Sequence, residues 1–172
     1  MVRGIFESTN ITGRNYSFVS TVDLENGMLV HKGALVPGSK DIYEALIPTS
    51  ATIAAEPVFV VGNPAWSYDT SSLVNQNENN YYIKAGVVFR VYGLKVTDKF
   101  GIADYGIDGT PVVGKYVGLQ NGSAKPIAAA TAPSTAFVGK VIQEADMGFE
   151  YYIGQHIDSR TKKIRIEVVK NG

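Results

Sequence analysis

The chain has 172 residues, 45% of them hydrophobic, which is enough for one domain with a packed core. Its 16 basic and 16 acidic residues give a formal net charge of +0, so it lacks the positive field that nucleic-acid and anionic-membrane binders use. Because it has no cysteine, disulfides, thiolate metal sites and a cysteine nucleophile are excluded.

No apolar run in the sequence is long enough for a signal peptide or a membrane span. We therefore expect a protein made in a cell's cytoplasm, with neither nucleic acid nor a membrane as its partner.

Residues 1–20 allow two interpretations. Ile5, Phe6, Tyr16 and Phe18 are separated by flexible polar residues, so this segment suits an extended arm that adds a strand to a partner's sheet edge. The same segment also suits a first strand that packs within the chain's own domain. The residues alone do not decide between the two, and in the first interpretation the four apolar side chains are the candidate partner contacts.

The rest of the chain, residues 21–172, predicts a mainly β fold: a single barrel or sandwich-like domain. Glycine and proline interrupt it at short intervals, and the segments between them are rich in Val, Ile, Tyr and Phe, which favour a pleated, half-buried surface. In chain order, the expected strands are Tyr16–Val22, Met28–Lys32, Ile42–Ile47, Pro57–Val61, Val87–Leu94, Val112–Leu119, Phe137–Gln143, Glu150–Gln155 and Ile164–Val169.

Three segments need separate treatment. Residues 134–145 fit a helical stripe as well as a strand, and Gly139 in the middle favours a strand. Residues 63–80 are too hydrophilic for a tight hairpin, and the small residues of 121–136 cannot fill a core. Both are therefore predicted as surface loops.

The final strand has the clearest pattern. Ile164, Ile166 and Val168 alternate with charged residues, as in a strand with one buried and one solvated face. Arg165 and Glu167 are expected on the solvated face.

One motif resembles a phosphate-binding loop. Gly109 is followed, after four residues, by Gly114 and Lys115, but Tyr116 stands where such a loop places a magnesium-binding Ser or Thr. Pro111 removes a backbone N–H donor, and the residues that follow favour a strand and a turn where a phosphate loop begins a helix. We therefore expect no nucleotide cofactor here.

No catalytic or metal-binding constellation is recognisable. His31 and His156 are far apart, without acidic residues at ligand spacing, and each suits a half-exposed strand position. Asp98, Asp104 and Asp108 bracket glycines; their spacing fits ordinary turns better than a calcium loop. The sequence thus predicts neither an enzyme nor a metal site.

The stretch from Ala85 to Ser123 carries a distinctive series of strand and turn residues: Gly86, Arg90, Tyr92, Leu94, Asp98, Phe100 and then Asp108–Gly122. This series resembles the head-decoration, or capsid-cement, proteins that tailed bacteriophages of Gram-positive hosts encode beside the major capsid protein. "DLENGMLVHKG" and "IRIEVVKNG" are also similar, whereas the loops 63–80 and 121–136 depart from the pattern.

The resemblance implies a non-enzymatic virion protein on the outside of the expanded head. Its partners would be the major capsid protein and, on the capsid, further copies of itself. Ile5, Phe6, Tyr16 and Phe18 are then the expected capsid contacts.

The alternative is a carbohydrate-binding or host-attachment module on the virion. Trp66, Tyr68, Tyr81 and Tyr82 flank the polar segment, and their rings suit stacking on sugars. The same aromatic residues also suit loop anchors folded over the sheet, which we favour because tyrosine combines a large apolar body with a polar tip.

Overall fold

A computed structural model describes residues 4–64, 81–146 and 162–172, and this part of the chain is mainly β. It contains eleven strands and one short 3-10 turn, η2 (Asp104–Gly106). The strands are β1 (Phe6–Asn10), β2 (Asn15–Val19), β3 (Leu29–Leu35), β4 (Ile42–Leu46), β5 (Phe59–Val61), β6 (Val88–Gly93), β7 (Lys99–Ala103), β8 (Tyr116–Gln120), β9 (Ser123–Ala129), β10 (Phe137–Asp146) and β11 (Lys162–Asn171).

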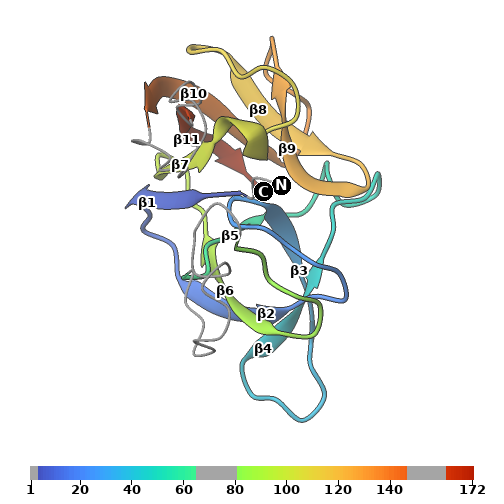
Figure 1. The fold of residues 1–172 in the computed structure, drawn as a ribbon. Helices are drawn as coiled ribbons and strands as arrows, with labels where there is room; N and C mark the ends of the chain where they lie inside the picture. Colours follow the sequence, from blue (N-terminus) through green and yellow to red (C-terminus); the bar gives the residue numbers. More distant parts are fainter. Residues whose placement is uncertain (1–3, 65–80, 147–161) are drawn as a thin grey trace, which may run out of the picture.

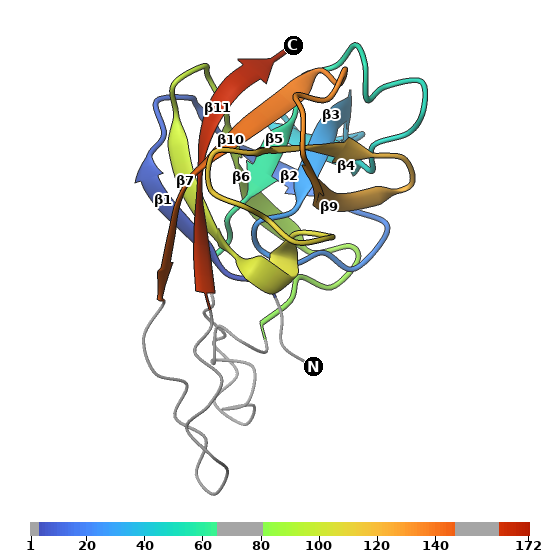
Figure 2. The same cartoon turned by 90° about the horizontal axis from the view of Figure 1, so that it is seen from above.

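The strands form two units that lie against each other (Figure 1). Five of them close into a barrel in the order β2-β4-β3-β5-β6, in which only the β2–β4 pair is parallel. The other six form an antiparallel sheet in the order β1-β7-β11-β10-β8-β9. Figure 2 shows the long β10–β11 pair in this sheet.

The larger core cluster joins the sheet to the barrel. Alternate side chains of β7 and β11 are apolar and point to the inner side of the sheet. There they pack against apolar side chains of the barrel strands. Its buried members are Leu29, Val58, Val60, Leu94, Phe100, Ile102, Ile107, Val117, Leu119, Phe137, Val141, Ile164, Ile166 and Val168.

The second core cluster fills the barrel and is rich in aromatic rings. Phe18 is fully buried, and its ring centroid lies 5.3 Å from that of Phe59 and 6.3 Å from those of Tyr16 and Tyr43. Such tilted and edge-on contacts are the favoured geometries of aromatic pairs.

Two polar side chains, those of the half-buried Asn171 and the buried Asp98, hold separate segments together. Asn171, in β11, exchanges hydrogen bonds with the backbone N–H and C=O of Val58 at 2.8 and 3.0 Å, and donates to the carbonyl of Leu94 at 2.9 Å. Asp98 accepts hydrogen bonds from the N–H and hydroxyl of Thr12 and from the N–H of Lys95. Both side chains thus satisfy backbone groups that the strands leave unpaired.

Most of the strand predictions are confirmed. Eight of the nine expected strands are present with shifted ends; Glu150–Gln155 lies outside the described residues. Residues 134–145 belong largely to the strand β10, as Gly139 suggested. In β11, Ile164, Ile166 and Val168 are buried, as their alternation predicts.

Three strands, β1, β7 and β9, are absent from the nine expected ranges, although a first strand within residues 1–20 was one of the two interpretations of that segment. Residues 121–136 are not simply a loop, because β9 pairs with β8 through the two-residue turn Asn121–Gly122, in which Gly122 has φ +76°. β9 is an edge strand, which is why small residues and a proline are tolerated there. The strand β7 lies among Asp and Gly residues whose turn signals concealed it.

The arm interpretation of residues 1–20 is also corrected. β1 pairs with β7 and β2 lies in the closed barrel, so both strands belong to the chain's own fold. The expected loop 63–80 lies almost entirely outside the described residues.

Candidate functional site

The four expected capsid contacts are not gathered on one surface. Phe18 is 0% exposed inside the barrel and Ile5 is 8% exposed, so neither offers a contact surface in this fold. Phe6 is half-buried, with its ring centroid 5.4 Å from that of Tyr92. Tyr16 packs against the barrel core. The apolar pattern that suggested an arm therefore reflects burial within two different β-sheets.

Of the expected sugar-stacking residues, Trp66 and Tyr68 lie outside the described residues. Tyr81 packs on the barrel core, and its hydroxyl accepts a hydrogen bond from the side chain of Asn63. Tyr82 is half-buried beside it in sequence. Tyr81 therefore packs within the chain's own fold.

The phosphate-loop motif does not form a phosphate cradle. The N–H of Gly114 donates to the carbonyl of Val141 at 2.8 Å, and the N–H of Lys115 donates to the carbonyl of Val112 at 3.0 Å. The segment leads into strand β8, so the positive end of a helix does not follow it.

His31 is fully buried, not half-exposed as expected. Its Nδ1 lies 3.0 Å from the carbonyl oxygen of Pro57 and must donate, because a carbonyl only accepts. The other ring nitrogen, Nε2, is buried and has no hydrogen-bond partner among the described residues. His156 lies outside them.

The three aspartates serve local structure. Asp98 is the buried acceptor described above, Asp104 accepts from the N–H of Tyr105 at 2.8 Å, and Asp108 accepts from the side chain of Gln120. Within residues 4–64, 81–146 and 162–172, no three His, Asp or Glu side chains are grouped so that they could hold a metal ion.

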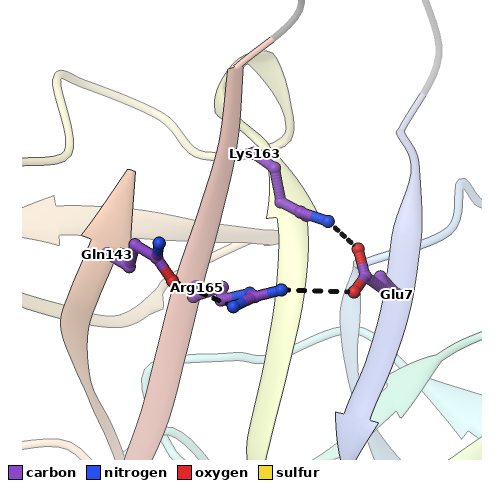
Figure 3. Close-up of polar contacts among 4 residues, drawn as sticks. All are labelled: Glu7, Gln143, Lys163 and Arg165. Carbon is purple, nitrogen blue, oxygen red and sulfur yellow. Dashed lines mark hydrogen bonds and ion pairs between the residues drawn. The ribbon is translucent and has the colours of Figure 1, made fainter. Parts of the chain in front are cut away.

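The solvated side of the six-stranded sheet carries a row of polar residues that spans four strands. Strand register places Glu7 of β1 beside Gly101 of β7, Gly101 beside Arg165 of β11, and Arg165 beside Gln143 of β10. Figure 3 shows the result: Lys163 and Arg165 both reach the carboxylate of Glu7, and Arg165 also donates to the side chain of Gln143 at 2.9 Å.

Gly101 makes this row possible. A Cβ atom at this position would lie 2.9 Å from Cδ of Lys163 and 3.6 Å from Cβ of Glu7. Because Gly101 has no side chain, the Lys163 side chain can pass close to the β7 backbone and reach Glu7 on β1. The Lys163 side chain is largely buried in this position and is only 14% exposed.

The row belongs to a larger charged surface, which we call the outer face. Lys99 lies opposite Glu167, with Nζ 4.0 Å from its carboxylate, and Lys140 lies opposite Glu167 on the other side. Paired residues share a side of the sheet, so these side chains join the row. The outer face comprises Glu7, Lys99, Lys140, Gln143, Lys163, Arg165 and Glu167.

Cations exceed anions on the outer face, although the whole chain has a formal charge of +0. The alternation in the last strand correctly placed Arg165 and Glu167 on a solvated face. Nothing in the sequence indicated that Glu7 and Lys99 would lie next to Arg165 and Glu167. That proximity depends on the pairing of strands that are far apart in the chain.

The described residues contain no helix that is long and apolar enough to cross a membrane. No protein-family model matches the sequence, and neither a curated protein nor a solved structure matches the chain.

Proposed function

We propose that this chain is a structural virion protein that binds the outer surface of a bacteriophage capsid and stabilises the expanded head. The observation that carries the proposal is the outer face, a polar surface across four paired strands with a surplus of cations. The strand and turn pattern of residues 85–123, which resembles that of capsid-cement proteins, supports the same role.

In this role the partner is the major capsid protein, and the outer face meets an acidic region of its surface. Complementary charge steers the encounter and sets the orientation of the two proteins. Weak contacts suffice, because many copies bind a lattice of repeated sites and neighbouring copies can support one another. The protein then resides on the virion surface after synthesis in the host cytoplasm, and it acts by adhesion, without catalysis.

The direct test mixes purified protein with expanded capsids that lack it and images the particles. We expect regular density on the outside of the shell. Charge reversal of the outer face with Lys99→Glu and Lys140→Glu should weaken coating by at least about tenfold, because like charges across an interface cost several kcal/mol. The matched control, Lys40→Glu with Lys84→Glu, makes the same charge change at exposed barrel-side lysines and should coat normally.

The two parts of the proposal fail separately. Bare shells at a saturating concentration of the unmodified protein would contradict the capsid role. Normal coating by the Lys99→Glu, Lys140→Glu variant would leave that role standing and show that the outer face is not the contact surface.

The alternative role, a carbohydrate-binding or host-attachment module built on Trp66, Tyr68, Tyr81 and Tyr82, has less support. Tyr81 is engaged with Asn63 and the barrel core, so its ring is not presented as a stacking platform.

A further inference from the structure

Three asparagines in the chain are followed by glycine: Asn26, Asn121 and Asn171. Asparagine is chemically labile in such a pair, because glycine has no side chain to hinder attack by its backbone nitrogen on the Cγ atom of the asparagine. For this attack the side-chain amide must turn toward the glycine nitrogen, and that nitrogen must lose its proton. The hydrogen bonds of these two groups therefore decide whether a folded Asn–Gly pair reacts.

The amide of Asn26 is held at both ends. Its Oδ1 accepts a hydrogen bond from the N–H of Asn63 at 2.8 Å, and its Nδ2 donates to the carbonyl of Asn63 at 2.8 Å. Gly27 is buried, and its N–H donates to the carbonyl of Val61 at 2.8 Å. The attack would have to break all of these hydrogen bonds.

Asn171 is held in the same way. Its Oδ1 accepts from the N–H of Val58, and its Nδ2 donates to the carbonyls of Val58 and Leu94. The N–H of Gly172 donates to the carbonyl of Ala136 at 3.0 Å. This pair is thus also restrained at the oxygen, at the amide nitrogen and at the attacking nitrogen.

Asn121 differs from the other two. It lies with Gly122 in the exposed turn between β8 and β9, and its Oδ1 accepts one hydrogen bond, from the N–H of Ser50 at 2.8 Å. Its Nδ2, the group that leaves in the reaction, has no hydrogen-bond partner in the part of the chain that the structure describes. The N–H of Gly122 donates to the carbonyl of Pro48 at 2.8 Å. Both restraints therefore come from one short segment, residues 48–50.

We propose that Asn121 is the site at which the folded chain deamidates, and that residues 48–50 restrain the reaction. The nitrogen of Gly122 gives its proton to water and forms a bond to Cγ of Asn121, while the Cγ–Nδ2 bond breaks and Nδ2 takes up a proton and leaves as ammonia. Water then adds to either carbonyl carbon of the resulting succinimide ring and opens it. The product at position 121 is aspartate or isoaspartate.

The modification changes the β8–β9 hairpin. Either product adds a negative charge to its turn. Isoaspartate also routes the backbone through the side-chain carbon, which lengthens the turn between the paired residues Gln120 and Ser123. The proposal does not depend on the capsid role, because this turn contributes no residue to the outer face.

The test incubates the full folded chain in mildly alkaline buffer and follows peptides of the three Asn–Gly pairs by mass spectrometry. Chromatography separates the aspartate and isoaspartate products. We expect Asn121 to react at least about fivefold faster than Asn26 or Asn171, because a typical hydrogen bond is worth roughly that factor and the other two amides must each break more of them. In denaturant, where these hydrogen bonds are lost, the three rates should be similar.

Ser50→Pro removes the N–H that holds Oδ1 of Asn121 and should speed deamidation at this site alone. Proline suits this position, because Ser50 is the second residue of a turn closed by the hydrogen bond from the N–H of Thr52 to the carbonyl of Thr49 at 3.0 Å. Ser50→Ala is the matched control: it keeps the N–H and should leave the rate unchanged. Thermal unfolding checks that each variant is folded.

Two results would overturn the proposal. One is a rate at Asn121 in the folded chain that is no higher than the rates at Asn26 and Asn171. The other is a folded Ser50→Pro variant in which Asn121 reacts no faster than in the unmodified chain.

Discussion

The barrel and the sheet bury their apolar faces in different ways. The barrel closes through the β6–β2 pair, so it has no edge strands, and its aromatic interior comes mostly from its own strands, with Ala124 of β9 added from the sheet. The sheet stays open, with β1 and β9 at its edges, and it needs the barrel surface to cover its inner side. The closed barrel therefore supports the inner side of the sheet, and the sheet presents its other side to solvent.

Protection of the two sheet edges differs as well. β9 carries an added bridge from Asp108 to Ile127, so part of its free edge is paired. β1 is short, its last three residues are exposed and polar, and its register shifts between Ser8 and Asn10. Short strands and bulges are ways in which native sheets avoid pairing with other chains.

Phe18→Ala should have the largest effect on stability, because it removes a fully buried ring at the centre of the barrel. We expect a loss of about 3 to 5 kcal/mol in the free energy of unfolding, measured by chemical denaturation. Phe137→Ala makes the same change in the sheet core, where the ring is also fully buried. If the two units unfold together, both variants show one shifted transition; two separate transitions would contradict a shared core.

Asn171→Ala should cost about 2 to 3 kcal/mol, because it leaves the N–H and C=O of Val58 and the carbonyl of Leu94 without this partner. This change tests the hydrogen-bonded link between sheet and barrel. Val169→Ala, at a 46% exposed position of the same strand, is the control and should stay within about 0.5 kcal/mol. Equal effects of the two substitutions would contradict the link.

Two glycines test the difference between the inner and outer sides of the sheet. A Cβ at Gly139 would lie 2.4 Å from Cγ2 of Ile166 and 2.8 Å from Cγ2 of Val117, so Gly139→Ala overpacks the core and should cost about 1 to 3 kcal/mol. Gly101→Ala would come too close to the flexible Lys163 side chain, while its contact with Cβ of Glu7 at 3.6 Å is an ordinary one, so it should cost less than about 1 kcal/mol. Denaturation curves of both variants decide this, and the reverse order would contradict the assignment of the two sides.

Glu7→Gln should have the smallest effect, about 0.5 to 1 kcal/mol at low salt, because the row lies on a partly solvated surface. The difference should shrink as salt screens the ion pairs, which denaturation at two ionic strengths will show. Glu56→Gln, an exposed carboxylate between β4 and β5, is the control. A salt-independent loss would indicate that Glu7 stabilises the sheet by packing and not by charge.

The strand content of the chain was predictable because strand alternation and turn chemistry are local. The turn expected after the phosphate-loop motif is present at Asn121–Gly122, and the alternation in β11 is present as well. The strand after the phosphate-loop motif was also predicted from local residues, and β8 begins there at Tyr116. The strand β9 was missed because its alanines carry little strand propensity and its pairing with β8 compensates for that.

The outer face could not be found in this way. Glu7 and Lys163 are 156 positions apart in sequence, and only the order β1-β7-β11 brings them together across Gly101.

The sequence by itself determined that the chain forms β-strands, where most of them lie and which side of the last strand is solvated, because these properties depend on neighbouring residues. Only the tertiary structure decided that the strands divide into a closed barrel and an open sheet, that the N-terminal apolar residues are used internally, and which charges share a face. Those outcomes depend on pairing between segments far apart in the chain, and the free energy of that pairing comes from the shared core.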